Sequence, residues 1–277
     1  MELLSSNSGY IARAHEYMRA EPSPTAEVVS DAYYSEKVTV LKESGDWVQI
    51  QTQVDKYRGW IRKKAFFSPS EDFKDLGQIA KVNRLQAHVY TQEDTTLGPF
   101  RTLPFESELS VIGAGTNAKR WLKIQLLDGK EYYIQSGDVT LDTNKITVKE
   151  MVDLSHTFKD LPYTWGGRSS FGYDCSGFVQ MLYRQCGIFL PRDSKDQYVW
   201  SGFRTISQDE LREGDLIYFG RAPDKIIHVG VSLGDTRFIH STVRENKPYI
   251  RISTLDDDEW SGRGELVFRG FKRVIES

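Results

Sequence analysis

Short runs of alternating apolar and polar residues, broken by Gly, Asp, Ser and Pro, fill the chain from about residue 22 to residue 142. Alternation over a few positions is typical of a strand with one buried face, and turn residues between such runs predict hairpins. Strands this short do not suffice for a large β-sandwich. A small closed barrel has no exposed edges, so this half of the chain is predicted to form small all-β barrels.

The strand pattern occurs twice, as a weak internal repeat. The first copy comprises residues 38–41, 47–51 and 59–61, and the second comprises residues 109–112, 121–125 and 132–134. The spacing from the second run to the third agrees to within one residue between the copies, and each copy is about 60 residues long. We therefore expect two barrels in succession. Residues 10–17 are predicted to form a short helix before the first barrel, and residues 66–76 and 143–145 are predicted linkers.

Composition excludes several classes of protein. The 277 residues allow two or three domains, and 39% apolar with 27% charged residues is typical of a folded globular protein. A net charge of −3 lacks the basic excess of a nucleic-acid-binding protein, and no run of 18 apolar residues is present to span a membrane. Two cysteines exclude a disulfide framework, and five scattered histidines without a CxxC or HExxH pattern argue against a zinc site.

The beginning of the chain bears on its compartment. It reads Met-Glu-Leu-Leu-Ser-Ser, without a basic segment followed by an apolar one. Because a secretory signal peptide has both segments, the sequence predicts a cytoplasmic protein; a signal that had been removed would predict a periplasmic or secreted one.

Beyond about residue 147 the pattern changes to mixed helices and strands. Cys175, Val179, Leu182 and Cys186 recur at the spacing of one helix face, and Gly187 is suited to end that helix. Cys175 then occupies the first turn, where free N–H groups and the helix dipole favour an anion and lower the pKa of a thiol. A Cys175–Cys186 disulfide is excluded, because eleven helical residues span about 16 Å and bridged Cα atoms lie roughly 4.4–6.8 Å apart. Cys186 is then a small buried apolar residue.

Two strand patterns carry one histidine each, His228 and His240, and a Leu233-Gly234-Asp235 turn lies between them. This arrangement predicts an antiparallel hairpin. With a three-residue loop the two histidines face each other directly, with Cβ atoms roughly 4.5–5.5 Å apart, whereas a two-residue loop puts them on opposite faces. On one face, His228 suits a base for Cys175 and His240 suits its orienting partner.

The motifs of this region resemble those of the NlpC-type cell-wall peptidases, which are papain-like cysteine peptidases with a Cys-His-His triad. They are Tyr163-x-Trp165-Gly166-Gly167, Asp174-Cys175-Ser176-Gly177-Phe178, Pro191-Arg192-Asp193-Ser194, Gly214-Asp215-Leu216, His228-Val229-Gly230-Val231 and His240-Ser241. The resemblance covers about 120 residues, with the motifs in the family's order and spacing. The earlier Val-x-Val-Leu, Trp-x-x-Ile and Gly-Trp-Ile segments resemble the bacterial SH3-like domain. Together they resemble the subgroup that cuts peptidoglycan stem peptides between γ-D-glutamate and a diamino acid.

This resemblance implies a fold and three catalytic roles. We expect two small all-β SH3-like barrels followed by an α+β papain-like catalytic domain. The expected boundaries are residues 1–80, which include the N-terminal helix, 81–144 and 145–277. The resemblance implies Cys175 as nucleophile, His228 as base and His240 as the polar third member.

The resemblance also implies a substrate site. Its implied lining residues are Tyr163, Trp165, Asp174, Ser176, Asp193 and Ser194. In the subgroup, an acid and a tyrosine of the first SH3-like domain hold a free N-terminal L-alanine. Asp193 matches the acid, and Tyr34 matches the tyrosine better than its neighbour Tyr33, although Ser35 stands where the family has Gly.

Structural interpretations stay open for several of these residues. Asp193 also suits the N-cap of a helix over residues 194–197, and Trp165 also suits plain packing. The acidic run at residues 256–259 is interpreted as a solvated loop rather than a cation site. The histidines outside the motifs, His15, His88 and His156, are interpreted as structural or surface residues.

The sequence thus predicts a cysteine endopeptidase that hydrolyses the γ-D-glutamyl–diamino acid bond of free peptides with an N-terminal L-alanine. It predicts no cofactor, no nucleic-acid partner and no membrane partner. Two other functions stay open: a wall-binding SH3-like module with an inactive third domain, and a different thiol acyltransferase or amidase on the same scaffold. The diamino acid, meso-diaminopimelate or lysine, is not determined by the sequence.

Overall fold

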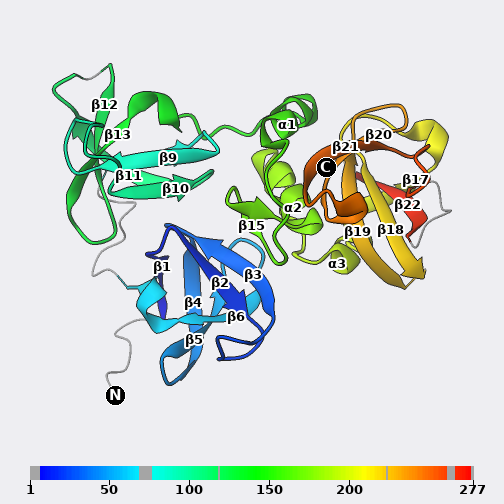
Figure 1. Ribbon diagram of the computed structural model, residues 1–277, viewed down its shortest axis with the longest axis horizontal. Coiled ribbons are helices and arrows are strands. Elements are labelled where there is room, and N and C mark those ends of the chain that lie inside the picture. The colour runs from blue at the N-terminus through cyan, green and yellow to red at the C-terminus, as the bar shows by residue number, and fades with distance from the viewer. Residues whose placement is uncertain (1–6, 69–76, 118, 223, 261–265, 276–277) are drawn as a thin grey trace. The chain divides into compact units, whose positions relative to one another are not determined.

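The structure, a computed structural model, describes residues 7–68, 77–117, 119–222, 224–260 and 266–275. It divides into two compact units, Met1–Asn144 and Lys145–Ser277 (Figure 1). Residues 1–6, on which the compartment prediction rests, and residues 69–76 of the first predicted linker lie outside the described residues. In the described ranges no helix combines the length and the apolar character needed to cross a membrane.

The N-terminal unit is built almost entirely of strands. Its first sheet comprises β1 (Ser8–Ile11), β2 (His15–Arg19), β3 (Val28–Tyr33), β4 (Lys37–Ser44), β5 (Trp47–Thr52), β6 (Arg58–Arg62) and β7 (Phe66–Phe67), with a 3₁₀ turn at Lys63–Ala65. The described strands follow the order β3-β2-β6-β5-β4-β1-β7. The alternating burial of β5, with Ile50 and Val48 in the core and Gln49 and Gln51 half-buried, is the pattern that predicted it.

The second sheet repeats the first. It comprises β8 (Gln78–Val82), β9 (Gln86–Tyr90), β10 (Arg101–Pro104), β11 (Glu108–Ala114), β12 (Trp121–Gln125), β13 (Glu131–Gln135) and β14 (Val139–Thr140), with a 3₁₀ turn at Ser136–Asp138. Its order in the described chain, β10-β9-β13-β12-β11-β8-β14, matches that of the first sheet strand for strand. The internal repeat seen in the sequence is therefore a repeat of topology.

The helix predicted over residues 10–17 is wrong. This segment forms the second half of β1 and the first three residues of β2. Ala, Arg and Glu in the segment suit a helix locally, but β1 pairs with β4 and β7, and β2 pairs with β3. Pairing with distant strands satisfies the backbone and buries Tyr10, Ile11 and Met18, which overrides local propensity. Phe66 and Phe67 of the first predicted linker are likewise a strand, β7.

The C-terminal unit combines three helices with strands in the part of the chain that is described. The helices are α1 (Val148–Ser155), α2 (Cys175–Gln185) and α3 (Ser194–Tyr198), and 3₁₀ turns lie at His156–Phe158, Gln208–Glu210 and Arg244–Asn246. The strands are β15 (Arg168–Ser169), β16 (Gly172–Tyr173), β17 (Phe203–Ile206), β18 (Leu216–Ala222), β19 (Lys225–Ser232), β20 (Arg237–Thr242), β21 (Tyr249–Thr254) and β22 (Val267–Val274).

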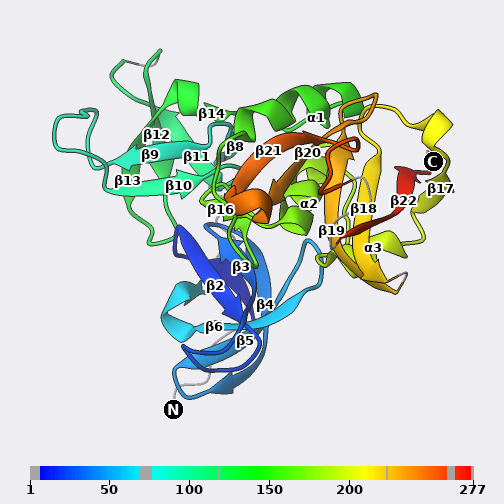
Figure 2. The same cartoon turned by 45° about the vertical axis from the view of Figure 1, so that its right-hand side comes forward.

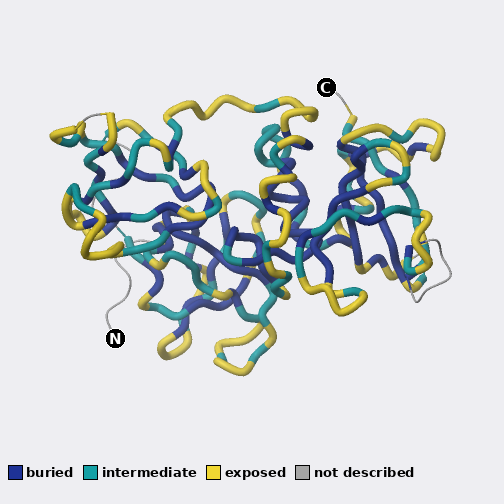
Figure 3. Tube along the Cα trace, turned by 45° about the horizontal axis from the view of Figure 1, so that its top comes forward, coloured by how far each residue is buried: buried dark blue, intermediate teal, exposed yellow. Residues whose placement is uncertain are grey.

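The long strands of this unit form one antiparallel sheet with the order β17-β22-β18-β19-β20-β21 among the described residues. Helix α2 packs against β19 and β20, and α3 packs against β19. Figures 1 and 2 show β19, β20 and β21 following one another beside α2. Figure 3 shows buried chain running through the interior of each unit and exposed chain at the loops.

The ends of the helices follow their sequences. Thr147 caps α1 in a capping box with Glu150, as its S/T-x-x-E spacing favours. Helix α2 is followed by its C-cap Cys186 and then by Gly187. The φ of Gly187, +74°, is the left-handed conformation that glycine adopts freely, and its N–H donates to the Arg184 carbonyl. The predicted helix with Cys175 in its first turn is thus confirmed.

Candidate active site

The N-terminus of α2 carries the predicted nucleophile. Cys175 is the first residue of the helix, and the Asp174 carboxylate caps the helix by accepting from the Gly177 N–H at 2.7 Å. The Cys175 Sγ lies 3.9 Å from the Ile227 carbonyl oxygen on β19, next to His228. The helix start therefore brings the sulfur against the strand that carries the predicted base.

A buried arginine braces this helix start. Arg192, 2% exposed, donates to both Asp174 carboxylate oxygens, at 3.1 and 2.6 Å, and to the Ser176 Oγ at 3.0 Å. A bidentate guanidinium–carboxylate pair holds both groups in one plane. Asp174 and Ser176 are thus fixed on either side of Cys175 by side chains from outside the helix.

The glycine-rich loop passes close to the same turn. A Cβ on Gly177 would lie 2.2 Å from the Gly167 carbonyl oxygen, and the Asp174 N–H donates to that oxygen at 2.9 Å. A side chain at Gly177 would push the loop off the helix. The segment that the loop approaches closely is therefore the first turn of α2.

The two histidines lie on neighbouring strands, but not in the predicted register. Val231 pairs with Ile239 and Ser232 with Phe238, so His240 lies across from Gly230 rather than from His228. The Leu233 N–H bonds to the Arg237 carbonyl, which makes residues 234–236 the loop, one residue later than predicted. The predicted direct pairing of the histidines is therefore wrong, and they are diagonal neighbours on one face.

The diagonal offset still brings the rings together. His228 Nε2 lies 2.7 Å from His240 Nδ1, and both residues are buried. Gly230 makes room for this, because a Cβ there would lie 2.7 Å from the Phe238 ring and 3.2 Å from the His240 Cβ. The predicted placement of both histidines on one face is confirmed.

Trp260 encloses the histidine pair. It is 1% exposed, stacks on His228 with ring centroids 5.1 Å apart, and meets His240 edge-on at 4.8 Å. An aromatic wall of this kind excludes water and fixes the ring planes. The base is thus held in a dry environment.

Burial sets the protonation of the site. It raises the pKa of the Cys175 thiol to about 12, and the negative charge of Asp174 adds to the increase. Burial lowers the pKa of His228 to about 3 and that of His240 well below its ordinary value, and Arg251 lowers both further. Burial thus opposes the expected lowering of the thiol pKa, because desolvation outweighs the helix dipole. The resting groups are a neutral thiol and neutral imidazoles.

The other residues of this unit predicted to contact substrate are Tyr163, Trp165, Asp193 and Ser194. The Tyr163 hydroxyl has a raised pKa, first by burial and then by the nearness of Cys175 and Asp174, so it keeps its proton. Trp165 is 62% exposed and thus not plain packing. Asp193 stands at the N-cap position of α3 without a capping bond from its side chain, and Ser194 begins the helix.

Tyr34 has a structural place. Its ring is 1% exposed within the core of the second sheet, and its hydroxyl oxygen accepts from the Leu127 N–H at 2.8 Å. The neighbouring Ser35 Oγ accepts from the Glu108 N–H at 2.8 Å. These bonds join the two sheets of the N-terminal unit, and a side chain so enclosed has no face for a substrate. The substrate role of Tyr34 stays a prediction, which this burial and this bond do not support.

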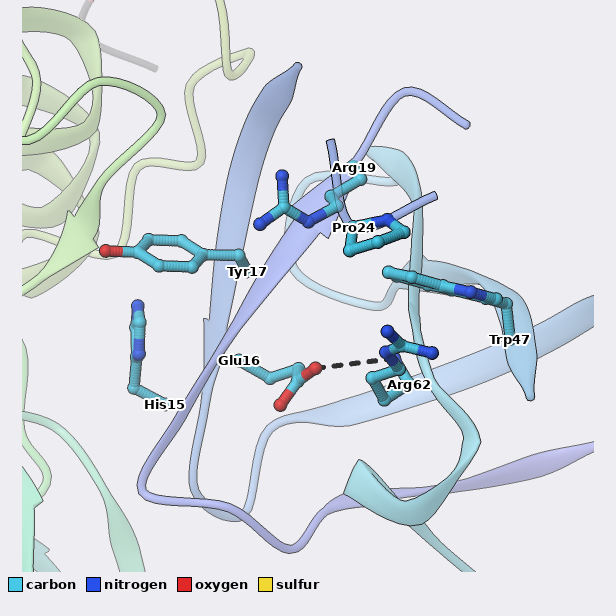
Figure 4. Close-up of a pocket in the computed structure, with 7 residues that line it drawn as sticks. All are labelled: His15, Glu16, Tyr17, Arg19, Pro24, Trp47 and Arg62. Carbon is cyan, nitrogen blue, oxygen red and sulfur yellow. Dashed lines mark hydrogen bonds between the residues drawn. The ribbon is translucent and has the colours of Figure 1, made fainter. Parts of the chain in front are cut away.

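A pocket of about 320 Å³ lies on the first sheet, and no residue predicted to contact substrate lines it (Figure 4). Its lining residues are His15, Glu16, Tyr17, Arg19, Pro24, Trp47 and Arg62. The Arg62 guanidinium lies 4.1 Å from the Trp47 ring centroid, and Glu16 accepts from the Arg62 N–H at 3.3 Å. His15, interpreted as structural, is paired with the buried Asp31 at 3.5 Å.

Sequence reasoning missed three contributors to the site: Arg192, Trp260 and Ser253, whose Oγ lies 3.0 Å from His240 Nε2. Arg192 stood inside a recognised motif, and its pairing with Asp174 is the kind of partner that a buried carboxylate needs. Trp260 and Ser253 reach the histidines through tertiary packing alone, for which the sequence carries no local signal. Asp215 of the Gly-Asp-Leu motif is structural, because it accepts two bonds from Arg273, each at 2.7 Å.

Comparison with known families divides the chain in three. Residues 14–66 match the bacterial SH3 domain, residues 71–140 match the GW (Gly-Tryp) dipeptide domain, and residues 160–269 match the NlpC/P60 family. The second region, expected to be SH3-like, thus matches a different domain description from the first, although the two sheets share one topology.

Several proteins are similar over most of the chain. The gamma-D-glutamyl-L-lysine dipeptidyl-peptidase of Bacillus subtilis is 27% identical over 77% of this chain and 72% of its own length. Dipeptidyl-peptidase 6 of Lysinibacillus sphaericus is 26% identical over 90% of this chain and 92% of its own length. The crystal structure of an NlpC/P60 family protein from Bacillus cereus, 21% identical, has the same fold, with a TM-score of 0.81 over 97% of this chain and all of that one.

Proposed function

The chain carries an NlpC/P60 cysteine peptidase domain behind bacterial SH3 and GW domains, and from this premise we propose that it hydrolyses the γ-D-glutamyl–diamino acid bond of peptidoglycan-derived peptides. The observation that carries the proposal is the buried pair His228–His240, with 2.7 Å between ring nitrogens, beside a cysteine at a helix start. Nucleophile, base and orienting group occur in that order across α2, β19 and β20.

The reaction starts from neutral groups. As the Cys175 Sγ attacks the γ-carbonyl carbon of the D-glutamyl residue, its proton passes to His228. Transfer during the attack avoids a thiolate in the free site, where burial raises the pKa of the thiol. His228 then gives the proton to the amine of the diamino acid, whose bond to the carbonyl breaks and leaves a thioester on Cys175. Water, deprotonated by His228, hydrolyses the thioester and frees the thiol.

Two donors suit the oxyanion that forms in each attack. The Cys175 N–H lies at the start of α2, where backbone N–H groups have no partner within the helix. The Tyr163 hydroxyl is the second proposed donor. Its raised pKa keeps the proton on the oxygen, which a donor requires.

Substrate selection is proposed to depend on a free amino end. Asp193, half-buried beside α3, would pair with the ammonium of an N-terminal L-alanine, and Trp165 and Ser194 would line the same site. Asp174 and Ser176 would contribute by their fixed positions beside Cys175. Two relatives named as dipeptidyl-peptidases support this, since such enzymes remove two residues from a free amino end. The name of the first also favours L-lysine as the diamino acid.

The strand orders also support a proposal for the fold of each domain. We propose that residues 1–80 and 81–144 form two small SH3-like barrels and that residues 145–277 form a papain-like catalytic domain. The identical strand orders of the two N-terminal sheets support the first part, and a cysteine-bearing helix packed on the histidine strands supports the second.

One assay tests the proposed function. The wild type is incubated with L-Ala-γ-D-Glu-L-Lys and with its meso-diaminopimelate counterpart. Each peptide is tested alone and with free D-amino acids, and the products are identified by mass spectrometry. We expect release of the diamino acid, a much slower reaction on the N-acetylated peptides, and no cleavage by Cys175→Ala. Cys186→Ala at the far end of the same helix is the matched control and should cleave normally. No cleavage by the wild type would leave a binding module, and transfer to D-amino acids would indicate an acyltransferase.

A further inference from the structure

The hydrogen-bonded chain from the active site does not end at His240. His240 Nε2 lies 3.0 Å from the Ser253 Oγ on β21, and Arg251 Nη1 donates to the same oxygen at 2.8 Å. Arg251 is also bonded to the Glu245 carboxylate. His228, His240 and Ser253 therefore come one each from three neighbouring strands, β19, β20 and β21.

The strand register explains how Ser253 comes to this place. His240 pairs with Arg251 and Phe238 pairs with Ser253 between β20 and β21. Side chains two positions apart on a strand share a face, so Arg251 and Ser253 both lie on the face of His240. Ser253 is 5% exposed and His240 is completely buried, so no bulk water competes for this contact.

The valences of these groups determine where the protons are. His228 uses Nε2 to contact His240, so Nδ1 is the nitrogen left to take the proton of Cys175. Nδ1 must then carry a lone pair, and the proton of neutral His228 must sit on Nε2 and be donated to His240 Nδ1. The proton of His240 must in turn sit on Nε2, and its acceptor is the Ser253 Oγ.

We propose that Ser253 is a positioning residue, which selects the productive tautomer of His240, and through it that of His228, by accepting the His240 Nε2–H. Arg251 holds the Ser253 oxygen in place from the other side. This inference rests on the proposed peptidase for its kinetic consequence, while the tautomers themselves do not depend on any substrate.

Charged groups around the pair fit this assignment. From the turn after β20, Arg244 faces His228 and is paired with Glu259 at 3.4 Å. Arg251, on β21, faces both histidines. The Cys175 thiol lies at the start of α2. The Asp174 carboxylate beside it is paired with Arg192. Positive charge and burial both lower the histidine pKa values, so both rings are neutral and their tautomers matter.

Kinetics of three variants test the role. Ser253→Ala should lower kcat about 10–100-fold, the range for a metal-bound histidine that loses its outer hydrogen-bond partner, with KM changed less than about twofold. Ser253→Thr keeps the hydroxyl on a strand that suits a β-branched residue and should recover most of kcat. Ser155→Ala removes another buried serine of this unit, bonded to a backbone carbonyl of α1, and should cleave as the wild type does. An unchanged kcat in Ser253→Ala, or a Thr variant as slow as the Ala variant, would overturn the proposal.

Nitrogen-15 NMR of the histidine rings gives a readout without substrate. In the wild type we expect His240 and His228 both protonated at Nε2, and in Ser253→Ala we expect His240 to lose that preference. Protonation of His240 at Nδ1 in the wild type would overturn the assignment. If the wild type shows the expected tautomers but cleaves no peptide, the proposed function fails while the tautomer assignment stands.

Discussion

Two sets of buried polar side chains, one from each unit, differ in the kind of partner that they bond to. In the N-terminal unit, the enclosed Tyr34 and Ser35 accept from the backbone N–H groups of Leu127 and Glu108. In the C-terminal unit, His228 bonds to His240, and Asp174 bonds to Arg192, so buried side chains contact one another.

This difference separates fold from chemistry. A buried hydroxyl that satisfies a backbone group stabilises one arrangement of strands and has nothing left to react. Burial raises the free energy of the charged forms of titratable groups, and direct contact between two such groups couples their protons. The repeat of the first two sheets therefore provides a framework, whereas the chemistry lies in the third region.

The largest expected effect is that of replacing His228 in the C-terminal unit, compared with a histidine of the N-terminal unit. His228→Gln should lower kcat by roughly 10⁶-fold, because loss of the base of a Ser-His-Asp triad costs about that much. His88→Gln in the N-terminal unit removes a histidine bonded to the Thr102 hydroxyl at 2.9 Å and should leave the rate within twofold of wild type. Steady-state rates on the free tripeptide measure both, and equal losses would abolish the distinction between the units.

Glycines give the next effect. Gly230→Ala puts a Cβ 2.7 Å from the Phe238 ring and 3.2 Å from the His240 Cβ, so the histidine pair must shift. We expect a loss of about 1–3 kcal/mol in the free energy of unfolding, as for other overpacked cores, together with a clear fall in kcat. Gly113→Ala in β11 meets no atom within 4 Å and should change neither. Urea unfolding and steady-state rates of both variants measure these effects. A Gly230→Ala enzyme with the stability and kcat of the wild type would show that the histidine pair tolerates displacement.

Acid should weaken the C-terminal unit through its histidines. The pKa of His228 is lowered from 6.5 in the unfolded chain to about 3, so the unfolded state binds the proton first and stability falls as the pH drops below 6.5. At pH 4.5 this amounts to about 2–3 kcal/mol for His228, since each pH step below its unfolded pKa costs about 1.4 kcal/mol. Thermal unfolding from pH 7 to pH 4.5 measures it. His228→Gln should show a shallower decline, and parallel curves would contradict the assignment.

The smallest expected effect tests whether Tyr34 stabilises the N-terminal unit through its buried bond to Leu127. Tyr34→Phe leaves the buried Leu127 N–H without its acceptor and should cost about 1–3 kcal/mol in the unfolding of the N-terminal unit. Cleavage of the free tripeptide should keep its KM. A KM raised tenfold in a folded variant would support the substrate role that the sequence resemblance implied.

Local pattern was enough to predict much of this protein. Alternation predicted the strands around Ile50 and Ile124, and helical spacing with Gly187 predicted α2. An even separation with an odd loop predicted one face for His228 and His240.

What failed depended on distant parts of the chain. The segment from Tyr10 is a strand because β4 and β7 pair with it. The hairpin loop at Gly234 begins one residue later than the sequence predicted, because the pairing of β19 with β20 sets the register. The thiol pKa of Cys175 rises with burial that only the packed domain provides. The supports Arg192, Trp260 and Ser253 come from three separate segments, so no local spacing could connect them to the triad.

Trapping the covalent intermediate tests the central claim most directly. The wild type is mixed with L-Ala-γ-D-Glu-L-Lys, quenched in acid within the first turnover, digested and examined by mass spectrometry. The account predicts an L-Ala-γ-D-Glu acyl group on the peptide that contains Cys175, and none when His228 is replaced by Gln. An acyl group on Cys186, or rapid cleavage through many turnovers with Cys175 unmodified at every quench time, would contradict it.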